Sequence, residues 1–147
     1  MAIISVEEAR QLSRSTLIKS GMDNKEAEII TDILLEADMM NRPTHGFIRL
    51  PAIVGETNKQ LDSSVKVVRE DGNYALVDGG GKPGYVAAYY AMEFAIKKTE
   101  KHGLALVGVK NSGHSGMLGY YARMAIKRDF IGIASATPVL WWRHGAE

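Results

Sequence analysis

Residues 65–110 have the sequence VKVVREDGNYALVDGGGKPGYVAAYYAMEFAIKKTEKHGLALVGVK, and this stretch decides the fold class. Its opening part contains two short runs, Val65–Val68 and Tyr74–Val77, with Asp71-Gly72-Asn73 between them. Valine and tyrosine favour strands, and Asp-Gly is typical of a tight turn between paired strands. The sequence therefore predicts a β-hairpin.

A helix and a further strand follow this hairpin. Residues 84–102 are rich in alanine, methionine, glutamate and lysine, which favour helices, and Gly103 stands where a C-cap glycine is expected. The apolar run Leu104–Val109 predicts a buried strand, the segment 117–128 a second helix, and Ile131–Ala134 another strand. This alternation of strands and helices indicates the α/β class.

The N-terminal part of the chain is predicted to be a helical head. Ser5–Glu8 and Asp23–Glu26 each have the form of a helix start signal, and apolar residues recur at helical spacing after both. The segment 44–60 is expected to add helical turns, with Thr44 as the N-cap and Pro51 bending the axis. The head should therefore precede the sheet as a separate helical layer.

Composition excludes several classes of function. The chain has 147 residues, 46% of them hydrophobic, and its 18 Lys and Arg against 17 Asp and Glu leave a formal charge of +1, which argues against a nucleic-acid partner. The absence of cysteine excludes disulfides and thiolate chemistry. The N-terminus becomes acidic too early for a signal peptide, and no apolar run approaches the roughly 20 residues of a membrane span. We expect a cytoplasmic protein without a membrane partner.

The glycine-rich stretch after Val77 imitates a dinucleotide-binding fingerprint. Gly79, Gly81 and Gly84 satisfy the pattern G-x-G-x-x-G between a predicted strand and a predicted helix. However, Pro83 removes an amide that would face a pyrophosphate, and no acidic residue follows the next strand to bind a ribose. We interpret the stretch as a tight structural turn.

A second loop, Asn111-Ser112-Gly113-His114-Ser115-Gly116, lies between a predicted strand and a predicted helix. Its small residues leave backbone N–H groups unobstructed, and a helix N-terminus favours an anion such as a cofactor phosphate. His114 would stand at the mouth of that site. The alternative is a strand-to-helix turn in which Ser or Asn merely caps the helix.

A third stretch combines a histidine with an arginine. His45 and Arg49 are four residues apart, so they would share one face if the segment is helical. Arginine can bind a carboxylate through two hydrogen bonds, and a histidine can exchange a proton with a neighbouring oxygen. Thr44 can orient the imidazole through its hydroxyl. This set suits a 2-hydroxy or 2-oxo acid, and a capped helix with a surface histidine is the alternative.

Thr44-His45-Gly46-x-x-Arg49-Leu50-Pro51 and the loop 111–116 occur together in the order and separation of one family. Both resemble the malate/L-lactate dehydrogenase family, which also includes ureidoglycolate and sulfolactate dehydrogenases and cyclic imino-acid reductases. The resemblance extends through Asp78-Gly79 and Gly103 to Gly132, nearly the whole chain. It implies a non-Rossmann nicotinamide-binding fold with a mixed or largely antiparallel sheet, and hydride transfer between NAD or NADP and a small 2-hydroxy or 2-oxo acid.

Roles for individual residues follow from this resemblance. His45 matches the proposed proton donor, Thr44 the serine that orients it, and Arg49 the arginine that binds the substrate carboxylate. Some members are described with the equivalent of His114 as the base, so both histidines remain candidates. The segment His114-Ser115-Gly116-Met117-Leu118 matches residues that contact the cofactor.

The resemblance also implies an organisation. Residues 1–62 would form a substrate-side and dimerisation region, and residues 63–147 the first part of the cofactor-binding domain of a homodimer. The remainder of the family fold would lie beyond Glu147, and Trp142-Arg143-His144-Gly145 departs from the family pattern. We therefore expect an incomplete fold.

Two alternatives differ in class from this hydroxyacid dehydrogenase. One is a truncated, non-catalytic member that acts only in binding or oligomerisation. The other is a metal-dependent hydrolase, but no two of the four histidines, His45, His102, His114 and His144, have a recognised ligand spacing, so no metal site is predicted.

Overall fold

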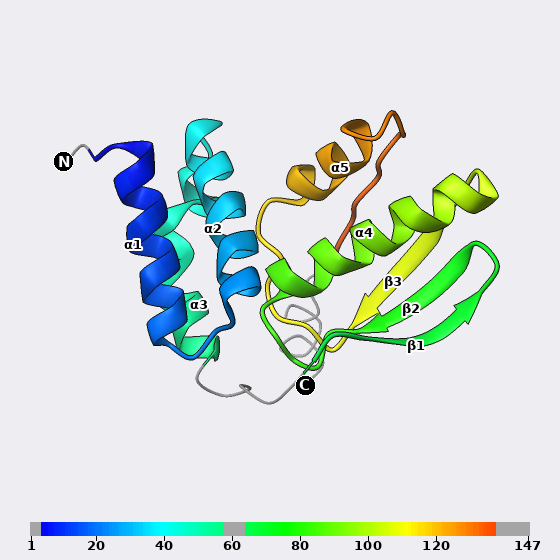
Figure 1. The fold of residues 1–147 in the computed structure, drawn as a ribbon, viewed down its shortest axis with the longest axis horizontal. Helices are drawn as coiled ribbons and strands as arrows, with labels where there is room; N and C mark the ends of the chain where they lie inside the picture. Colours follow the sequence, from blue (N-terminus) through cyan, green and yellow to red (C-terminus); the bar gives the residue numbers. More distant parts are fainter. Residues whose placement is uncertain (1–3, 58–63, 138–147) are drawn as a thin grey trace, which may run out of the picture.

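The computed structural model describes residues 4–57 and 64–137, as a helical head beside a three-stranded sheet with its own helices. The elements in chain order are α1 (Val6–Lys19), α2 (Asn24–Met39), the 3₁₀ turns η1 (Pro43–His45) and η2 (Phe47–Arg49), α3 (Leu50–Thr57), β1 (Lys66–Asp71), β2 (Tyr74–Asp78), α4 (Gly84–His102), β3 (Leu106–Lys110) and α5 (Leu118–Ile126). Figure 1 shows α1 to α3 packed together at one end, and α4, α5 and the sheet at the other. The predicted α/β class is confirmed.

Both predicted helix starts in the head are present. Ser5 and Glu8 form a reciprocal capping box, in which the Glu8 N–H donates to Ser5 Oγ at 3.1 Å and the Ser5 N–H donates to Glu8 Oε2 at 2.8 Å. The Asp23 side chain caps α2 by accepting the Glu26 N–H at 2.9 Å. Helix α2 then supplies much of the core, with eight buried residues: Ala27, Ile29, Ile30, Thr31, Ile33, Leu34, Leu35 and Ala37.

The sheet has the order β1-β2-β3, and it is mixed. Strands β1 and β2 pair antiparallel as the predicted hairpin, whereas β2 and β3 pair parallel. A parallel pair needs a crossover, which α4 supplies by lying across the sheet (Figure 1). Ala75 and Val77 of β2 are buried, while all six residues of β1 are exposed. Helix α4 ends as predicted at Gly103, whose φ of 78° is left-handed.

The two later strand predictions are corrected. Strand β3 is shorter than predicted and is not buried, since Leu106 and Val109 are exposed. It is exposed because it lies at the edge of the sheet and because α4 covers only one of its faces. The segment Ile131–Ala134 forms no strand. It lies against α5 instead, so closely that a Cβ on Gly132 would be 2.4 Å from the carbonyl oxygen of Ala122. Its two isoleucines, Ile131 and Ile133, are left 94% and 85% exposed.

The helix predicted from Thr44 is also corrected. Residues 43–49 form the two 3₁₀ turns, Thr44 caps nothing by its side chain, and α3 begins only at Leu50. Pro51 therefore falls in the first turn of α3, where its missing N–H costs no hydrogen bond and bends no helix. The later helix, predicted over 117–128, is confirmed with shorter bounds as α5.

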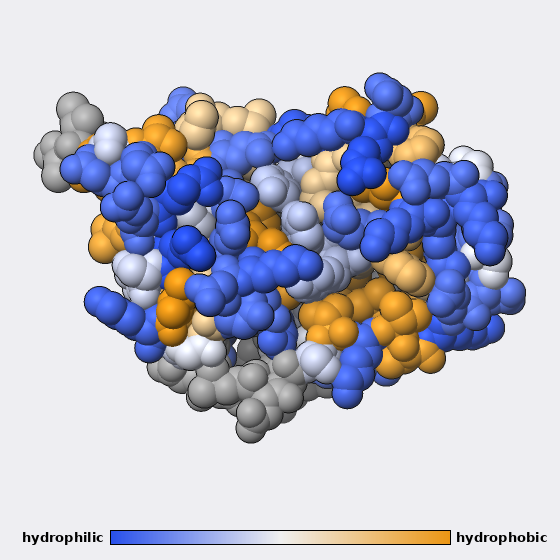
Figure 2. Space-filling model, viewed as in Figure 1, coloured by the Kyte–Doolittle hydropathy of each residue, from blue (hydrophilic) through white to orange (hydrophobic). Residues whose placement is uncertain are grey.

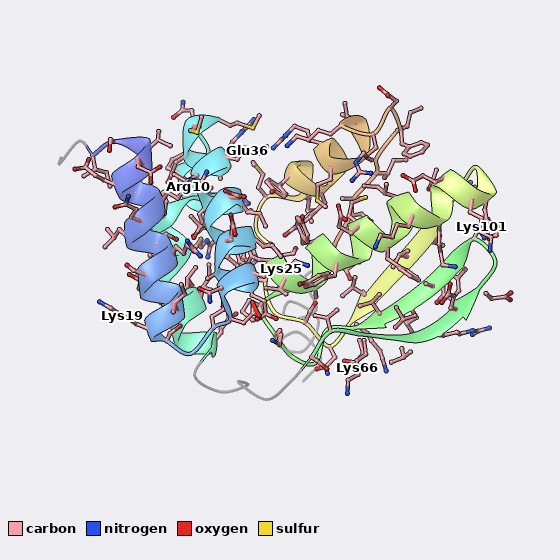
Figure 3. All side chains as sticks on the ribbon, in the orientation of Figure 1. Arg10, Lys19, Lys25, Glu36, Lys66 and Lys101 are labelled. Carbon is pink, nitrogen blue, oxygen red and sulfur yellow. The ribbon has the colours of Figure 1, made fainter. Side chains whose placement is uncertain are left out.

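Ion pairs join the head to the rest of the molecule. Glu36 on α2 points toward α5 (Figure 3), where Nε of Arg123 donates to Glu36 Oε1 at 2.6 Å. Lys82, just before α4, contacts Glu26 of α2 at 2.6 Å, and both side chains are largely buried. Partly buried pairs are screened less by salt than exposed ones, so these two contacts help to hold α2 against α4 and α5.

Hydrophobic surface gathers on the sheet side of the molecule. Figure 2 shows an apolar patch where the strands lie in Figure 1. The exposed large apolar residues of the strands are Val67, Val68, Leu106 and Val109. Such a surface is typical of a face that another segment or chain covers.

Candidate active site

The glycine-rich turn serves to pack two loops together. The Gly81 N–H donates to the Asn111 carbonyl at 2.7 Å, and the Gly113 N–H donates to the Lys82 carbonyl at 2.9 Å. A Cβ on Gly84 would stand 2.1 Å from the Gly113 carbonyl oxygen, so only glycine permits this approach. These amides are occupied by backbone carbonyls and are not available to a pyrophosphate. The structural interpretation of the glycine pattern is confirmed.

Two tyrosines support the loop that carries His114. The Tyr85 ring lies under Gly116, where a Cβ would be 2.3 Å from Tyr85 Cε1, and it meets the His114 ring edge-on with centroids 5.9 Å apart. The buried Tyr121 hydroxyl donates to the Ser115 carbonyl at 2.6 Å. Gly116 itself has a φ of 69°, which favours glycine. The loop is therefore held from below by a ring and by a hydrogen bond.

The N-terminus of α5 opens directly after this loop. Its N-cap residue is Met117, and no side chain in the described part of the molecule accepts a hydrogen bond from the first turn. The side-chain cap expected in the alternative interpretation of this loop is therefore wrong. Unsatisfied N–H groups and the positive end of the helix dipole favour an anion there. The small residues Ser115 and Gly116 just before Met117 and Leu118 are compatible with a cofactor phosphate.

Arg49 and His45 do not share a helical face, because η1 and η2 are separate turns divided by Gly46. The two turns are tied together by Arg49, whose Nε donates to the Thr44 carbonyl at 2.8 Å. Thr44 Oγ1 lies 3.0 Å from His45 Nδ1, within hydrogen-bonding distance. The hydroxyl is thus placed to orient the imidazole, although by a local contact of neighbours and not by helical spacing.

Asp38 explains why the segment is not one helix. In a continuous helix the Phe47 N–H would donate to the Pro43 carbonyl, but it donates at 2.9 Å to Asp38 Oδ2 near the end of α2. The Pro43 carbonyl accepts the Gly46 N–H at 3.2 Å instead, which closes a 3₁₀ turn. No pattern in the sequence singled out Asp38, because its partner lies nine residues away in a different element.

His45 and His114 converge from the two halves of the chain. Their ring centroids lie 6.4 Å apart, with the planes tilted by 33°. Partial burial lowers the pKa of His114, and the positive charge of Arg49 and the neighbouring His45 lower it further. The charges of Arg49 and His45 therefore both act on the His114 imidazole. The structure brings three of the predicted site residues together.

Tyr85 and Glu56 are additional residues of this region. Burial raises the pKa of Tyr85 to about 12, with Arg49 lowering it and Glu56 raising it, so both charged groups act on the same hydroxyl. The Tyr85 hydroxyl is buried and has no hydrogen-bond partner among the described residues. Glu56 Oε2 is 3.0 Å from the position of a Cβ on Gly113. Neither residue belongs to a motif in the sequence: Tyr85 looks like an ordinary core residue of an alanine-rich helix, and Glu56 like a single helical glutamate.

His102 does not join this group, because it is an exposed residue at the end of α4. The fourth histidine, His144, lies outside the described residues, as does the tail from Pro138. Within residues 4–57 and 64–137, no group of three or more His, Asp or Glu side chains can hold a metal ion. None of the helices described there is long and apolar enough to cross a membrane.

Known proteins give an independent comparison. A family model described as malate/L-lactate dehydrogenase matches residues 4–141. The chain belongs to this family. Among relatives in the malate/L-lactate dehydrogenase family, an L-sulfolactate dehydrogenase of Methanothermobacter thermautotrophicus is 35% identical over 136 residues, which is 90% of this chain and 40% of that protein. A malate dehydrogenase of Pyrococcus abyssi is 41% identical over 123 residues, which is 80% of this chain and 33% of that protein.

Solved structures of the malate/L-lactate dehydrogenase family agree. The malate dehydrogenase of Pyrococcus horikoshii superposes with a TM-score of 0.83 at 33% identity, covering 86% of this chain and 37% of that one. The sulfolactate dehydrogenase of Methanocaldococcus jannaschii has the same TM-score of 0.83 at 30% identity. The chain thus spans about two fifths of the length of these relatives. The predicted family and its non-Rossmann fold are confirmed.

Proposed function

We propose that this chain is part of an NAD- or NADP-dependent oxidoreductase that interconverts a small 2-hydroxy acid and the corresponding 2-oxo acid. The observation that carries the proposal is the convergence of His45, His114 and Arg49 on one region, although they come from distant parts of the sequence. The relatives support it, since their names describe malate, sulfolactate and ureidoglycolate dehydrogenases.

Arg49 is proposed to bind the substrate carboxylate. Its Nε is held by the Thr44 carbonyl, so its terminal nitrogens are free among the described residues to bind an anion. A guanidinium can donate two parallel hydrogen bonds to a carboxylate, which fixes both its position and its plane. The C2 oxygen of the acid would then be directed toward the two imidazoles.

Proton transfer at that oxygen is assigned to His45 or His114. In the reducing direction a hydride adds to C2 of the oxo acid, and one imidazole gives its proton to the oxygen. Thr44 favours His45 for this role, because its hydroxyl holds Nδ1 and leaves Nε2 for the substrate. The lowered pKa of His114 favours a neutral ring, which suits a base in the oxidising direction.

A bound nicotinamide cofactor supplies or accepts the hydride. The uncapped N-terminus of α5, with Ser115 and Gly116 before it and Met117 and Leu118 at its start, fits a phosphate of such a group. Residues 63–147 would accordingly be the first part of the cofactor domain, and residues 1–62 the substrate side.

A second candidate function is a non-catalytic one, in which the chain only binds a partner or forms a homodimer. It is supported by the exposed apolar side chains of Ile131 and Ile133, and by those of the strand residues Val67, Val68, Leu106 and Val109. Direct binding of reduced NAD or NADP separates the two candidates, since only the dehydrogenase requires it.

The decisive experiment is a substrate panel. Malate, lactate, sulfolactate and ureidoglycolate, with the corresponding oxo acids, would be assayed with NAD and with NADP on a chain of full family length. Nicotinamide absorbance should change with at least one acid. No turnover with any acid, together with no binding of either cofactor, would contradict the proposal.

A further inference from the structure

Asp38 stands in an unfavourable place for the helix that carries it. It is the penultimate residue of α2, whose last turn contains no basic residue. The C-terminal end of a helix carries partial negative charge, so a carboxylate there is repelled, and a lysine or arginine would be the stabilising choice. A residue that breaks a local rule in this way usually serves a contact elsewhere.

That contact is with the turn that separates His45 from Arg49. After α2 the chain reverses at Asn41, whose φ of 55° is left-handed, and the Arg42 N–H returns to the Ala37 carbonyl at 2.8 Å. This reversal brings the turn back alongside the end of α2. Asp38 Oδ2 accepts the Phe47 N–H at 2.9 Å.

Gly46 makes this approach possible. A Cβ at this position would stand 2.0 Å from Asp38 Oδ1 and 2.2 Å from its Cγ, a separation that no side chain can have. Gly46 is buried and has ordinary negative φ, so the glycine is required here for space and not for backbone conformation. The carboxylate and the glycine are therefore complementary parts of one contact.

We propose that Asp38 is a positioning residue for the active site, and that its carboxylate sets the relative placement of His45 and Arg49. By accepting the Phe47 N–H it prevents the segment from closing into one helix. A single helix would place both side chains at fixed helical spacing, whereas the break at Gly46 lets Arg49 fold back onto the Thr44 carbonyl while the His45 ring faces His114. This inference rests on the proposed function, which gives those two residues their roles.

The test compares Asp38→Ala with Asp38→Asn in a chain of full family length. Asparagine keeps an oxygen that can accept the Phe47 N–H, whereas alanine does not. For Asp38→Ala we expect KM for the hydroxy acid to rise on the order of tenfold, with cofactor Kd unchanged, because small misplacements of positioning groups are costly. Asp38→Asn should stay within about twofold of the parent, because the acceptor oxygen is retained.

Asp23→Ala is the matched control. It removes the same kind of hydrogen bond, in which Asp23 Oδ1 accepts the Glu26 N–H, at the other end of the same helix. If Asp38 only stabilised the fold through its hydrogen bond to the Phe47 N–H, both alanine variants would lower Tm and leave KM unchanged. A KM change in Asp38→Ala that is absent from Asp23→Ala supports positioning, and equal KM values in the two overturn it.

A second pair of variants distinguishes loss of the contact between Asp38 and Gly46 from general misfolding. Gly46→Ala should lower kcat/KM, because its Cβ collides with the carboxylate, and Asp38→Ala combined with Gly46→Ala should recover part of the loss by removing the collision. Additive losses would overturn the proposed contact.

Binding of oxamate, a 2-oxo acid analogue, measured by calorimetry, distinguishes a failure of the proposed function from a failure of the proposed role of Asp38. Oxamate that fails to bind the parent protein counts against the proposed function, and oxamate that binds the parent and Asp38→Ala equally counts against the role of Asp38.

Discussion

The His45 and His114 rings lie 6.4 Å apart, one on a 3₁₀ turn that follows α2 and the other on the loop before α5. Neither ring reaches this place by local sequence spacing. His45 is carried there by the reversal after α2, and His114 by the packing of its loop over Tyr85. Because the two imidazoles lie so close together, single substitutions are needed to show which of them transfers the proton.

His45→Ala, in a chain of full family length, should lower kcat on the order of 10²-fold or more with cofactor affinity retained, because a general acid or base contributes that much. Steady-state kinetics and cofactor titration by fluorescence measure the two effects. Near-normal turnover in His45→Ala, with a large loss in His114→Ala, would transfer the proton-exchange role to His114.

Arg49→Lys should raise KM for the hydroxy acid far more than it changes cofactor Kd. The ammonium keeps the charge but cannot form the planar two-point contact with a carboxylate. Arg128→Lys is the control, because among the described residues that arginine pairs with Glu100 alone, on the surface, at 3.7 Å. Equal losses of substrate and cofactor affinity in Arg49→Lys would show that Arg49 acts through the fold and not on the substrate.

His114 should titrate below its usual pKa of 6.5 in the 147-residue chain, and Arg49→Gln should move its pKa upward by removing one of the causes. Because the folded pKa is lowered, the unfolded chain binds more protons between the two values, and this group costs stability as pH falls through about 6.5. NMR of the imidazole C2 proton measures the pKa, and thermal unfolding of His114→Gln should show less loss of Tm between neutral and mildly acid pH. An upward-shifted His114 would contradict the packing described.

Tyr121→Phe should destabilise the folded chain by about 1 kcal/mol, because the partly buried hydrogen bond to the Ser115 carbonyl is lost. Cofactor affinity should fall as well, since the loop before α5 is no longer held. Tyr120→Phe is the matched control: its ring meets Tyr121 edge-on, but its hydroxyl donates no hydrogen bond within the described residues. Identical effects of the two substitutions would remove Tyr121 from the support of the loop.

The 147-residue chain alone should turn over malate, lactate and related acids slowly or not at all, and it should associate in solution. It spans about two fifths of the length of its relatives, and Ile131 and Ile133 are almost fully exposed. Light scattering gives the mass, and nicotinamide absorbance gives the rate. A monomer with robust turnover would mean that the active site has been placed wrongly.

Local signals in the sequence determined the elements of this protein. The Ser5–Glu8 capping box, the Asp71-Gly72 turn and the glycine at position 103 each act through hydrogen bonds or dihedral angles of residues a few positions apart. Their outcome is therefore contained in a short stretch of chain. The family patterns around His45 and His114 named the candidate site residues in the same way, although their roles stay predictions.

Tertiary structure alone decided the arrangement of the site. The Phe47 N–H donates to the Asp38 carboxylate on α2 and not to the Pro43 carbonyl, so the segment forms two 3₁₀ turns in place of the expected helix. Strand β3 is exposed because α4 covers one face of the sheet, and residues 131–134 lie on α5 rather than in the sheet. Each outcome depends on a competition between a local partner and a distant one, and only the packing of whole elements settles which partner is near enough to bind.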